Sequence, residues 1–250
     1  MNVLNIYKPV SITPFQLIEK IKNAYSDIYD KKIAYAGRLD PMAQGVMIYL
    51  VGEEVKQRDK YQKLQKIYTT KVIFGTTTDT YDPLGTITSV NQSDINAAKK
   101  ASHIFSKEYM GLLLQKYPPF SYPKINGEPM YRLAREGRLK EKDIPEKEVF
   151  VYANQVGNFR EIFLNEIRSD IVHKISNVNG DFRQKEIINE WVGLENIKLI
   201  VADAQFEVSS GTYIRSLVHE LGKMSGCGAI AYDITRTQVG EYRIEDSVRL

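Results

Sequence analysis

The residue of this sequence best placed to do chemistry is an aspartate on a loop bounded by glycines and a proline. Asp40 stands between Leu39 and Pro41, with Gly37 and Gly45 further out. Glycines permit positive φ, and Pro41 restricts its own backbone and that of Asp40, so a helix or central strand is disfavoured. We expect a rigid loop that presents the carboxylate for function. The alternative is an Asx turn, in which the side chain bonds its own loop.

The run from Ala36 to Val46 resembles the catalytic loop of the TruB family of tRNA pseudouridine synthases, whose pattern is Gly-x-Leu-Asp-Pro-x-Ala-x-Gly. The matching positions are Gly37, Leu39, Asp40, Pro41, Ala43 and Gly45. The resemblance implies that Asp40 is a covalent nucleophile toward ribose C1′ or uracil C6 of a flipped uridine; the sequence does not choose between the two carbons. A carboxylate nucleophile divides one difficult step into two easier ones. The resemblance implies no cofactor, and no metal site is expected.

Two further stretches match family motifs in the family order. Tyr68 precedes a loop from Gly75 to Gly85 that resembles Gly-x-x-Thr-Asp-Thr-x-Asp-x-x-Gly. The resemblance makes Tyr68 the active-site tyrosine, which stacks on the target uracil, and we interpret Asp79 and Asp82 as turn-forming and RNA-proximal. The stretch from Phe120 to Gly137 resembles a third motif. Its substrate-binding candidates are Lys124, Tyr131 and Arg135.

A fourth motif, Gly-Thr-Tyr-Ile-Arg, ends at Arg215 and opens an amphipathic helix. The resemblance pairs Arg215 with Asp40, and a guanidinium favours the ionised form of a neighbouring carboxylate. A surface arginine is a weaker interpretation, because the helix dipole disfavours a cation at a helix start. The resemblance completes the substrate-binding set with four residues from other parts of the chain. They are Tyr35, Arg38, Tyr213 and Ile234.

Two departures from the family pattern stand out. Tyr35 occupies the place where the family usually has a histidine that helps to disrupt the T loop. An insertion at about residues 168–196 lengthens the chain, and the sequence stops at Leu250 without the PUA domain that many relatives carry. We therefore expect a single TruB-like catalytic domain over residues 1–250.

Composition indicates an ordinary globular protein, with 43% hydrophobic and 26% charged residues and a net charge of +3. The chain has no apolar run long enough to span a membrane and no signal-peptide pattern at its start. The single cysteine fits a reducing cytosol, so a cytoplasmic monomer is expected. Basic clusters interleaved with 16 tyrosines suit recognition of flipped or single-stranded RNA, although each cluster alone is also typical of a solvated helix face.

The hydrophobic pattern predicts an α+β fold with a central mixed, largely antiparallel sheet, because strands and helices do not alternate strictly. The resemblance adds flanking helices and an RNA-binding cleft. Expected strands are 3–7, 46–51, 67–74, 85–90, 149–156, 162–167 and 197–208. Expected helices begin near Pro14, Glu53, Ile95, Met130 and Ile214.

The activity implied by the resemblance is the isomerisation of uridine 55 in the T arm of tRNA, with the T-arm stem-loop as partner. One alternative is a TruB-like RNA-binding protein or tRNA chaperone that has lost activity, against which intact Asp40, Tyr68 and Arg215 argue. A guide-RNA-dependent synthase of the same superfamily is less favoured, because the chain is short and shows no PUA domain.

Overall fold

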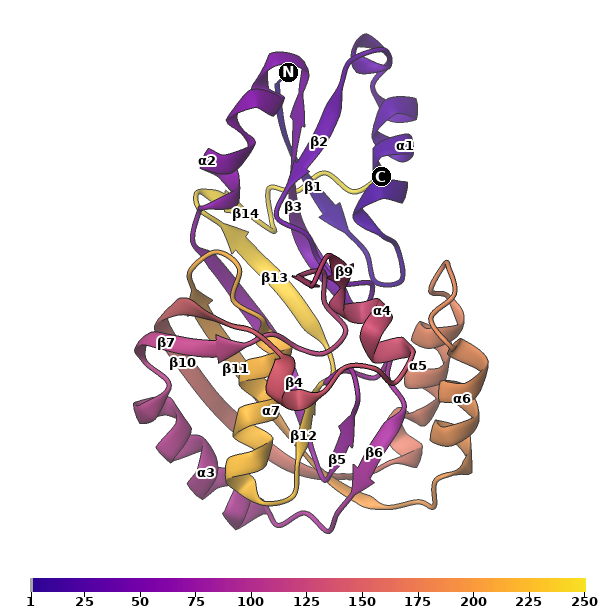
Figure 1. The fold of residues 1–250 in the computed structure, drawn as a ribbon, viewed down its shortest axis with the longest axis vertical. Coiled ribbons are helices and arrows are strands. Elements are labelled where there is room, and N and C mark those ends of the chain that lie inside the picture. Colours follow the sequence, from indigo (N-terminus) through magenta and orange to yellow (C-terminus); the bar gives the residue numbers. More distant parts are fainter. Residues whose placement is uncertain (1) are drawn as a thin grey trace.

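In the computed structural model, which describes residues 2–250, helices pack against both faces of a long mixed sheet (Figure 1). The described strands form a ten-stranded sheet with the order β1-β3-β13-β4-β11-β10-β7, while β2 pairs with β3, β12 with β4 and β14 with β13. Two short hairpins, β5-β6 and β8-β9, lie apart from it. The strands are β1 (Val3–Lys8), β2 (Ile33–Ala36), β3 (Ala43–Val51), β4 (Lys66–Phe74), β5 (Thr76–Thr78), β6 (Ile87–Val90), β7 (Gly111–Lys116), β8 (Lys124–Ile125), β9 (Glu128–Pro129), β10 (Glu146–Phe163), β11 (Lys198–Val208), β12 (Ala229–Ala231), β13 (Ile234–Val239) and β14 (Tyr242–Arg243).

The first helix begins, and the last helix ends, at a signal that the sequence shows. Thr13 caps the first helix through a reciprocal capping box with Gln16, and Gly226 ends the last one at φ 77°. The α-helices are α1 (Pro14–Ala24), α2 (Arg58–Gln62), α3 (Ile95–Glu108), α4 (Met130–Arg135), α5 (Asn165–Ser176), α6 (Gln184–Gly193) and α7 (Ile214–Ser225). Short 3-10 helices are η1 (Ser26–Ile28), η2 (Gly52–Gln57) and η3 (Glu141–Asp143).

Alternation of side chains along the central strands sends apolar groups to both faces of the sheet. On one face, β4 and β11 share a buried core with three helices, α1, α3 and α7. On the other face, Ile73 and Leu199 pack with the α5-α6 pair, and Val46 and Ile48 pack near α2. The sheet is therefore the middle layer of three, and the loops at its centre are held from both sides.

One close approach of backbones fixes where the catalytic loop leaves the sheet. β3 and β13 pair in parallel, with Arg236 opposite Gly45. A Cβ on Gly45 would lie 2.2 Å from the carbonyl oxygen of Arg236, and Gly45 has φ 109°. Only glycine fits this position, so the sequence at Gly45 sets the distance between the two strands.

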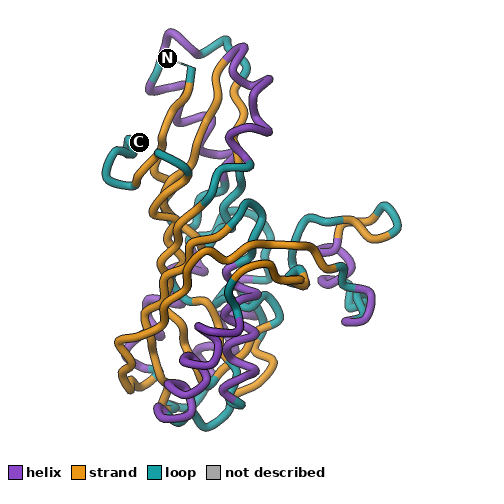
Figure 2. The backbone as a smooth tube through the Cα atoms, turned by 90° about the vertical axis from the view of Figure 1, so that its left-hand side faces the viewer, coloured by secondary structure: helices purple, strands orange, loops and turns teal. Residues whose placement is uncertain are grey.

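Two segments of the chain leave the sheet and lie opposite each other. The arm, residues 117–145, carries β8, β9 and α4 and projects away from the sheet between β7 and β10 (Figure 2). The helical hairpin, residues 165–193, carries α5 and α6 between β10 and β11. It occupies the expected insertion at 168–196 and forms two packed helices.

The predicted α+β class with a mostly antiparallel sheet is confirmed. The prediction of a second strand over 162–167 was wrong in its second half, because β10 runs unbroken to Phe163 and α5 begins at Asn165. Among residues 2–250, every helix is too short or too polar to cross a bilayer.

Candidate active site

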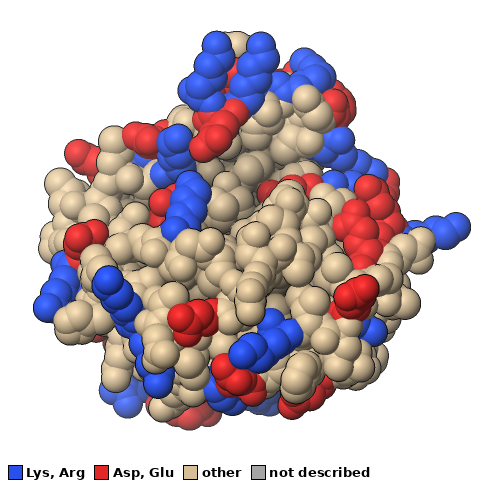
Figure 3. Space-filling view, turned by 90° about the horizontal axis from the view of Figure 1, so that it is seen from below, with Lys and Arg blue, Asp and Glu red and all other residues tan. Residues whose placement is uncertain are grey.

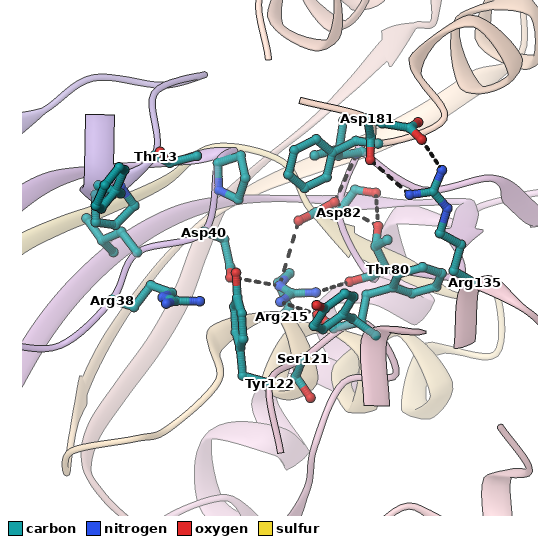
Figure 4. Close-up of a pocket in the computed structure, with 18 of the residues that line it drawn as sticks. Thr13, Arg38, Asp40, Thr80, Asp82, Ser121, Tyr122, Arg135, Asp181 and Arg215 are labelled. Atoms are coloured by element: carbon teal, nitrogen blue, oxygen red, sulfur yellow. Dashed lines mark hydrogen bonds and ion pairs between the residues drawn. The ribbon is translucent and has the colours of Figure 1, made fainter. Parts of the chain in front are cut away.

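Asp40 lies on the loop between β2 and β3, and its side chain points away from that loop (Figure 4). Its Oδ2 accepts a hydrogen bond of 2.8 Å from Nε of Arg215, in the first turn of α7. This contact replaces the Asx turn that the loop sequence also allowed. The carboxylate keeps 30% of its side-chain surface exposed while Arg215 keeps 4%, so a buried cation holds a carboxylate that solvent and substrate can reach.

The guanidinium of Arg215 is fixed by carbonyl oxygens from two other segments. Nη1 donates to the carbonyl of Thr80 at 2.6 Å, and Nη2 donates to the carbonyl of Phe120 at 3.4 Å. Because arginine offers five donors in a rigid plane, these bonds orient Nε toward Asp40. The loop after β5 and the arm therefore both set the direction of the nucleophile candidate.

A second carboxylate shares this arginine and was missed as a site residue from the sequence. Oδ2 of Asp82 lies 3.7 Å from Nε of Arg215, while its Oδ1 accepts from Thr80 Oγ1 at 2.7 Å and from Leu84 N at 2.9 Å. Asp82 is buried, and its bonds to Thr80 and Leu84 agree with the turn-forming role expected from the sequence; it also lines a cavity beside Asp40. Its position in the Thr-Asp-Thr-x-Asp pattern was the available signal.

Burial, with a smaller effect of the negative charge of Asp40, raises the pKa of Asp82 to about 6 against the opposing effect of Arg215. One guanidinium is thus shared by two carboxylates that differ in exposure. Physically, the exposed member of such a set is the one available for attack, and the buried member keeps the cation in place.

Tyr68, Tyr213 and Ile234 meet on the side of Asp40 that faces β4 and β13, where they line a cavity of about 520 Å³ together with Asp40 and Arg215. Tyr68 is buried in β4, and its hydroxyl accepts from Nη1 of Arg236 at 3.5 Å. A flat apolar wall beside a carboxylate is the environment that a stacked uracil requires.

Arg236 is a further residue that sequence reasoning did not single out. Its buried guanidinium donates to the carbonyl oxygens of Val46 at 2.8 Å, Gly37 at 3.2 Å and Arg38 at 3.4 Å. These bonds hold both ends of the catalytic loop against β13. No local pattern announces such a role, because Arg236 lies nearly 200 residues from the loop it holds.

A second cavity of about 420 Å³ lies on the other side of Asp40, between the arm and the helical hairpin. Tyr131 and Arg135 line it from the arm, and Phe182 lines it from the hairpin. Arg135 Nη1 donates to the carbonyl of Asp181 at 3.2 Å, and its Nη2 pairs with the Asp181 carboxylate. The tip of the insertion therefore forms part of the wall around Asp40.

The remaining sequence candidates are divided between the cavities and the arm. Arg38 stacks on Tyr122 with its guanidinium 3.6 Å from the ring centroid, and it donates to the hydroxyl of Tyr35 at 3.0 Å. Tyr35 and Arg38 line both cavities. Lys124 is exposed on β8 and lines neither. Within residues 2–250, no group of three or more His, Cys, Asp or Glu side chains is arranged to hold a metal ion.

Comparison with known proteins agrees with this geometry. Residues 26–180 match the model of the "TruB family pseudouridylate synthase (N terminal domain)". The chain is 30% identical to tRNA pseudouridine synthase B of Clostridium acetobutylicum and 31% identical to that of Clostridium novyi; each match covers 99% of this chain and 70% of the relative.

Solved structures with the same fold include the Cbf5-Nop10-Gar1 complex, with a TM-score of 0.60 at 18% identity. That match covers all of this chain, which spans about half (52%) of the solved chain. The fold, the family model over 26–180 and the curated relatives agree with the resemblance first seen around Asp40, and this chain belongs to the TruB family of pseudouridylate synthases.

Proposed function

We propose that this protein isomerises uridine 55 in the T arm of tRNA to pseudouridine, with Asp40 as the nucleophile. The observation that carries the proposal is the hydrogen bond of 2.8 Å between Arg215 and Asp40, in a cavity that also contains Tyr68 and Ile234. The names of the curated relatives support tRNA as the substrate.

The reaction moves the ribose C1′ from N1 of uracil to C5 of the same base, so the carbon at C5 loses a proton and N1 gains one. Asp40 adds to ribose C1′ or uracil C6 and is released when the new bond forms. Arg215 pairs with the carboxylate and keeps it aimed at the nucleotide. Tyr68 stacks on the base that has left the RNA helix, which offsets part of the few kcal/mol that flipping costs.

The other site residues have supporting roles in this proposal. Tyr213 and Ile234 border the base on the Tyr68 side of Asp40, and Tyr35, stacked edge-on against Tyr49 at 6.2 Å, offers an aromatic surface at the entrance. Arg38, Lys124, Tyr131 and Arg135 extend outward along the catalytic loop and the arm, where the T-arm backbone would pass.

The test is incubation of the protein with an unmodified tRNA transcript, followed by carbodiimide labelling and mass spectrometry to locate pseudouridine. We expect one pseudouridine, at position 55, and none in a transcript with cytidine at that position. An Asp40→Asn variant should bind the transcript with unchanged affinity and give no product, because it removes the nucleophile and keeps the volume. Tight binding without product by the wild-type protein would favour the inactive RNA-binding alternative.

A further inference from the structure

Five cationic side chains that line the 520 Å³ cavity form no ion pair in residues 2–250: two are the exposed Arg38 and Arg58, and three come from strands of the sheet. Lys66 begins β4, Lys147 lies on β10 and Arg236 lies on β13, and they converge on the cavity from three strands. None of them takes part in an ion pair among the described residues. The Asp40–Arg215 pair balances its own charge, so the positive charge of these three side chains has no counter-charge in the cavity.

Two of the three cations are almost completely buried. Lys66 is 3% exposed and Arg236 is 1% exposed, and Lys66 Nζ donates to backbone carbonyls of Gln62 and Leu64. Burial, followed by the charges of Arg236 and Lys147, lowers the pKa of Lys66 to about 7. A buried cation without a counter-charge is costly, and such a cluster is stabilised when an anion enters it.

Lys147 is placed so that its ammonium reaches the same space. It lies over the rings of Tyr117 and Tyr213, 5.3 and 5.5 Å from their centroids. A Cβ at Gly211, which has φ 83°, would lie 2.2 Å from Lys147 Nζ. Because Gly211 has no side chain, the ammonium of Lys147 can occupy this space.

The cluster also borders the catalytic loop. A Cβ at Gly37 would lie 3.7 Å from Arg236 Nη1 and 3.8 Å from the Cε of Lys66, and Gly37 is in the same loop as Asp40. On the face seen from below, Lys and Arg gather at the upper edge of the view and elsewhere are scattered among Asp and Glu (Figure 3).

We propose that Lys66, Lys147 and Arg236 form a phosphate subsite that holds one backbone phosphate of the RNA next to the uridine at Asp40. The proposal rests on the proposed function, since it takes RNA as the ligand. A phosphate here would supply the missing counter-charge and would draw the flipped nucleotide into the cavity, because phosphate contacts position a nucleic acid without reading its sequence.

The experiment is a double-mutant cycle between Lys147 and single phosphates of a T-arm stem-loop. Neutral methylphosphonate linkages replace, one at a time, the phosphates on either side of the target uridine. Binding is measured by titration in an Asp40→Asn background, so that no turnover occurs. We expect one of the two linkages to weaken binding about tenfold when Lys147 is present, and to have no further effect in Lys147→Met.

Matched variants separate charge from structure. Lys147→Arg should keep the sensitivity to that linkage, and so should Lys223→Met, which removes an exposed lysine in the last turn of α7. Thermal unfolding checks that each variant folds, and Lys147→Gln replaces Lys147→Met if the latter does not. If each linkage weakens binding of the folded Lys147→Met variant as much as it weakens binding of its parent, the subsite is overturned.

The outcome is independent of the isomerisation assay. Pseudouridine formation without coupling between Lys147 and a phosphate removes the subsite and leaves the proposed function intact. Coupling in a protein that makes no pseudouridine removes the proposed function and keeps the subsite.

Discussion

Arg135, in the arm, is bound by Asp181 at the tip of the helical hairpin, so the two excursions from the sheet are tied together beside Asp40. The two side chains are 44% and 73% exposed. The hydrogen bond from Arg135 lowers the pKa of Asp181. An arginine that can bind RNA phosphate is therefore engaged by an internal carboxylate in the absence of RNA.

Asp181→Asn should strengthen binding of a T-arm stem-loop, because Arg135 becomes free for phosphate. If Arg135 then gains one phosphate contact, the salt dependence of log affinity should steepen by about 0.7. The thermal midpoint should not change, since both partners are exposed. In an Arg135→Ala background Asp181→Asn should have no effect on affinity; an equal effect in both backgrounds would show that Asp181 acts elsewhere.

Arg215→Lys should fold but lose most activity. Lysine keeps the positive charge beside Asp40 and Asp82, yet a single ammonium cannot reproduce the planar set of bonds to Asp40, Thr80 and Phe120. Misplacing a nucleophile by about 1 Å costs on the order of 10²-fold in rate. Single-turnover kinetics with excess enzyme would measure this loss, and we expect binding to change little.

The matched control is Arg138→Lys. Arg138 also bonds two carboxylates, Glu128 and Glu136, but it lies exposed on the arm. It should keep nearly the wild-type rate. Similar losses in the two variants would mean that Arg215 has no special place in the reaction.

The sequence predicted those parts of the fold that short-range patterns specify. The capping box at Thr13, the apolar run of β3 and the amphipathic face of α7 all form as their spacing indicates. It failed along β10, where Gly157 and Asn158 resemble a turn but form a bulge inside one strand of 18 residues. Long-range pairing with β11 overrides the local signal there.

The candidate site shows the same division. Asp40, Tyr68 and Arg215 were found because each lies in a motif, and the structure brings them to one cavity. Asp181 and Arg236 were not found, because their contacts join positions 46 and nearly 200 residues apart and depend on how the arm and strands pack. Chemistry at these positions depends on tertiary structure that no local pattern encodes.

The helical hairpin should be a structural brace of the site rather than a detachable flap. Trp191 is fully buried, and its Nε1 donates to the carbonyl of Pro83 at 3.2 Å, next to Asp82. Trp191→Ala should lower the free energy of unfolding by about 3–5 kcal/mol in urea titrations. Val192→Ala, at the next position of α6 but 54% exposed, should change it by less than about 0.5 kcal/mol.

Three basic residues of the hairpin are already engaged by other parts of the protein, which favours the bracing role over RNA binding. Arg168 donates to the carbonyl of Leu194, Lys174 lies 2.8 Å from Asp170, and Arg183 lies 2.8 Å from Asp79. A Gly-Ser linker in place of the hairpin should therefore destabilise the protein before it affects RNA binding. A stable deletion variant with full activity would contradict the bracing role.

Asp82 should make the protein lose stability as the pH rises from about 4 to 6. Burial raises its folded-state pKa to about 6, above the ordinary value of 3.8. In this range the folded state still holds the proton that the unfolded state has released, so ionisation favours unfolding. The stabilisation that comes from protonated Asp82 is complete below pH 3.8 and is lost as the pH rises through 6. Its size is roughly 3 kcal/mol, because the folded and unfolded pKa values differ by about 2.

Asp82→Asn removes this titration and keeps the shape of the side chain. Urea unfolding of both proteins at several pH values between 4 and 7 measures the effect. We subtract the unfolding free energy of Asp82→Asn from that of the wild type. This difference should fall by up to roughly 3 kcal/mol as the pH rises across that range. Asp203→Asn, at a half-exposed carboxylate on β11, is the control and should show no such trend. A pH-independent difference for Asp82→Asn would mean that Arg215 keeps Asp82 ionised throughout, with one cation fully balancing both carboxylates.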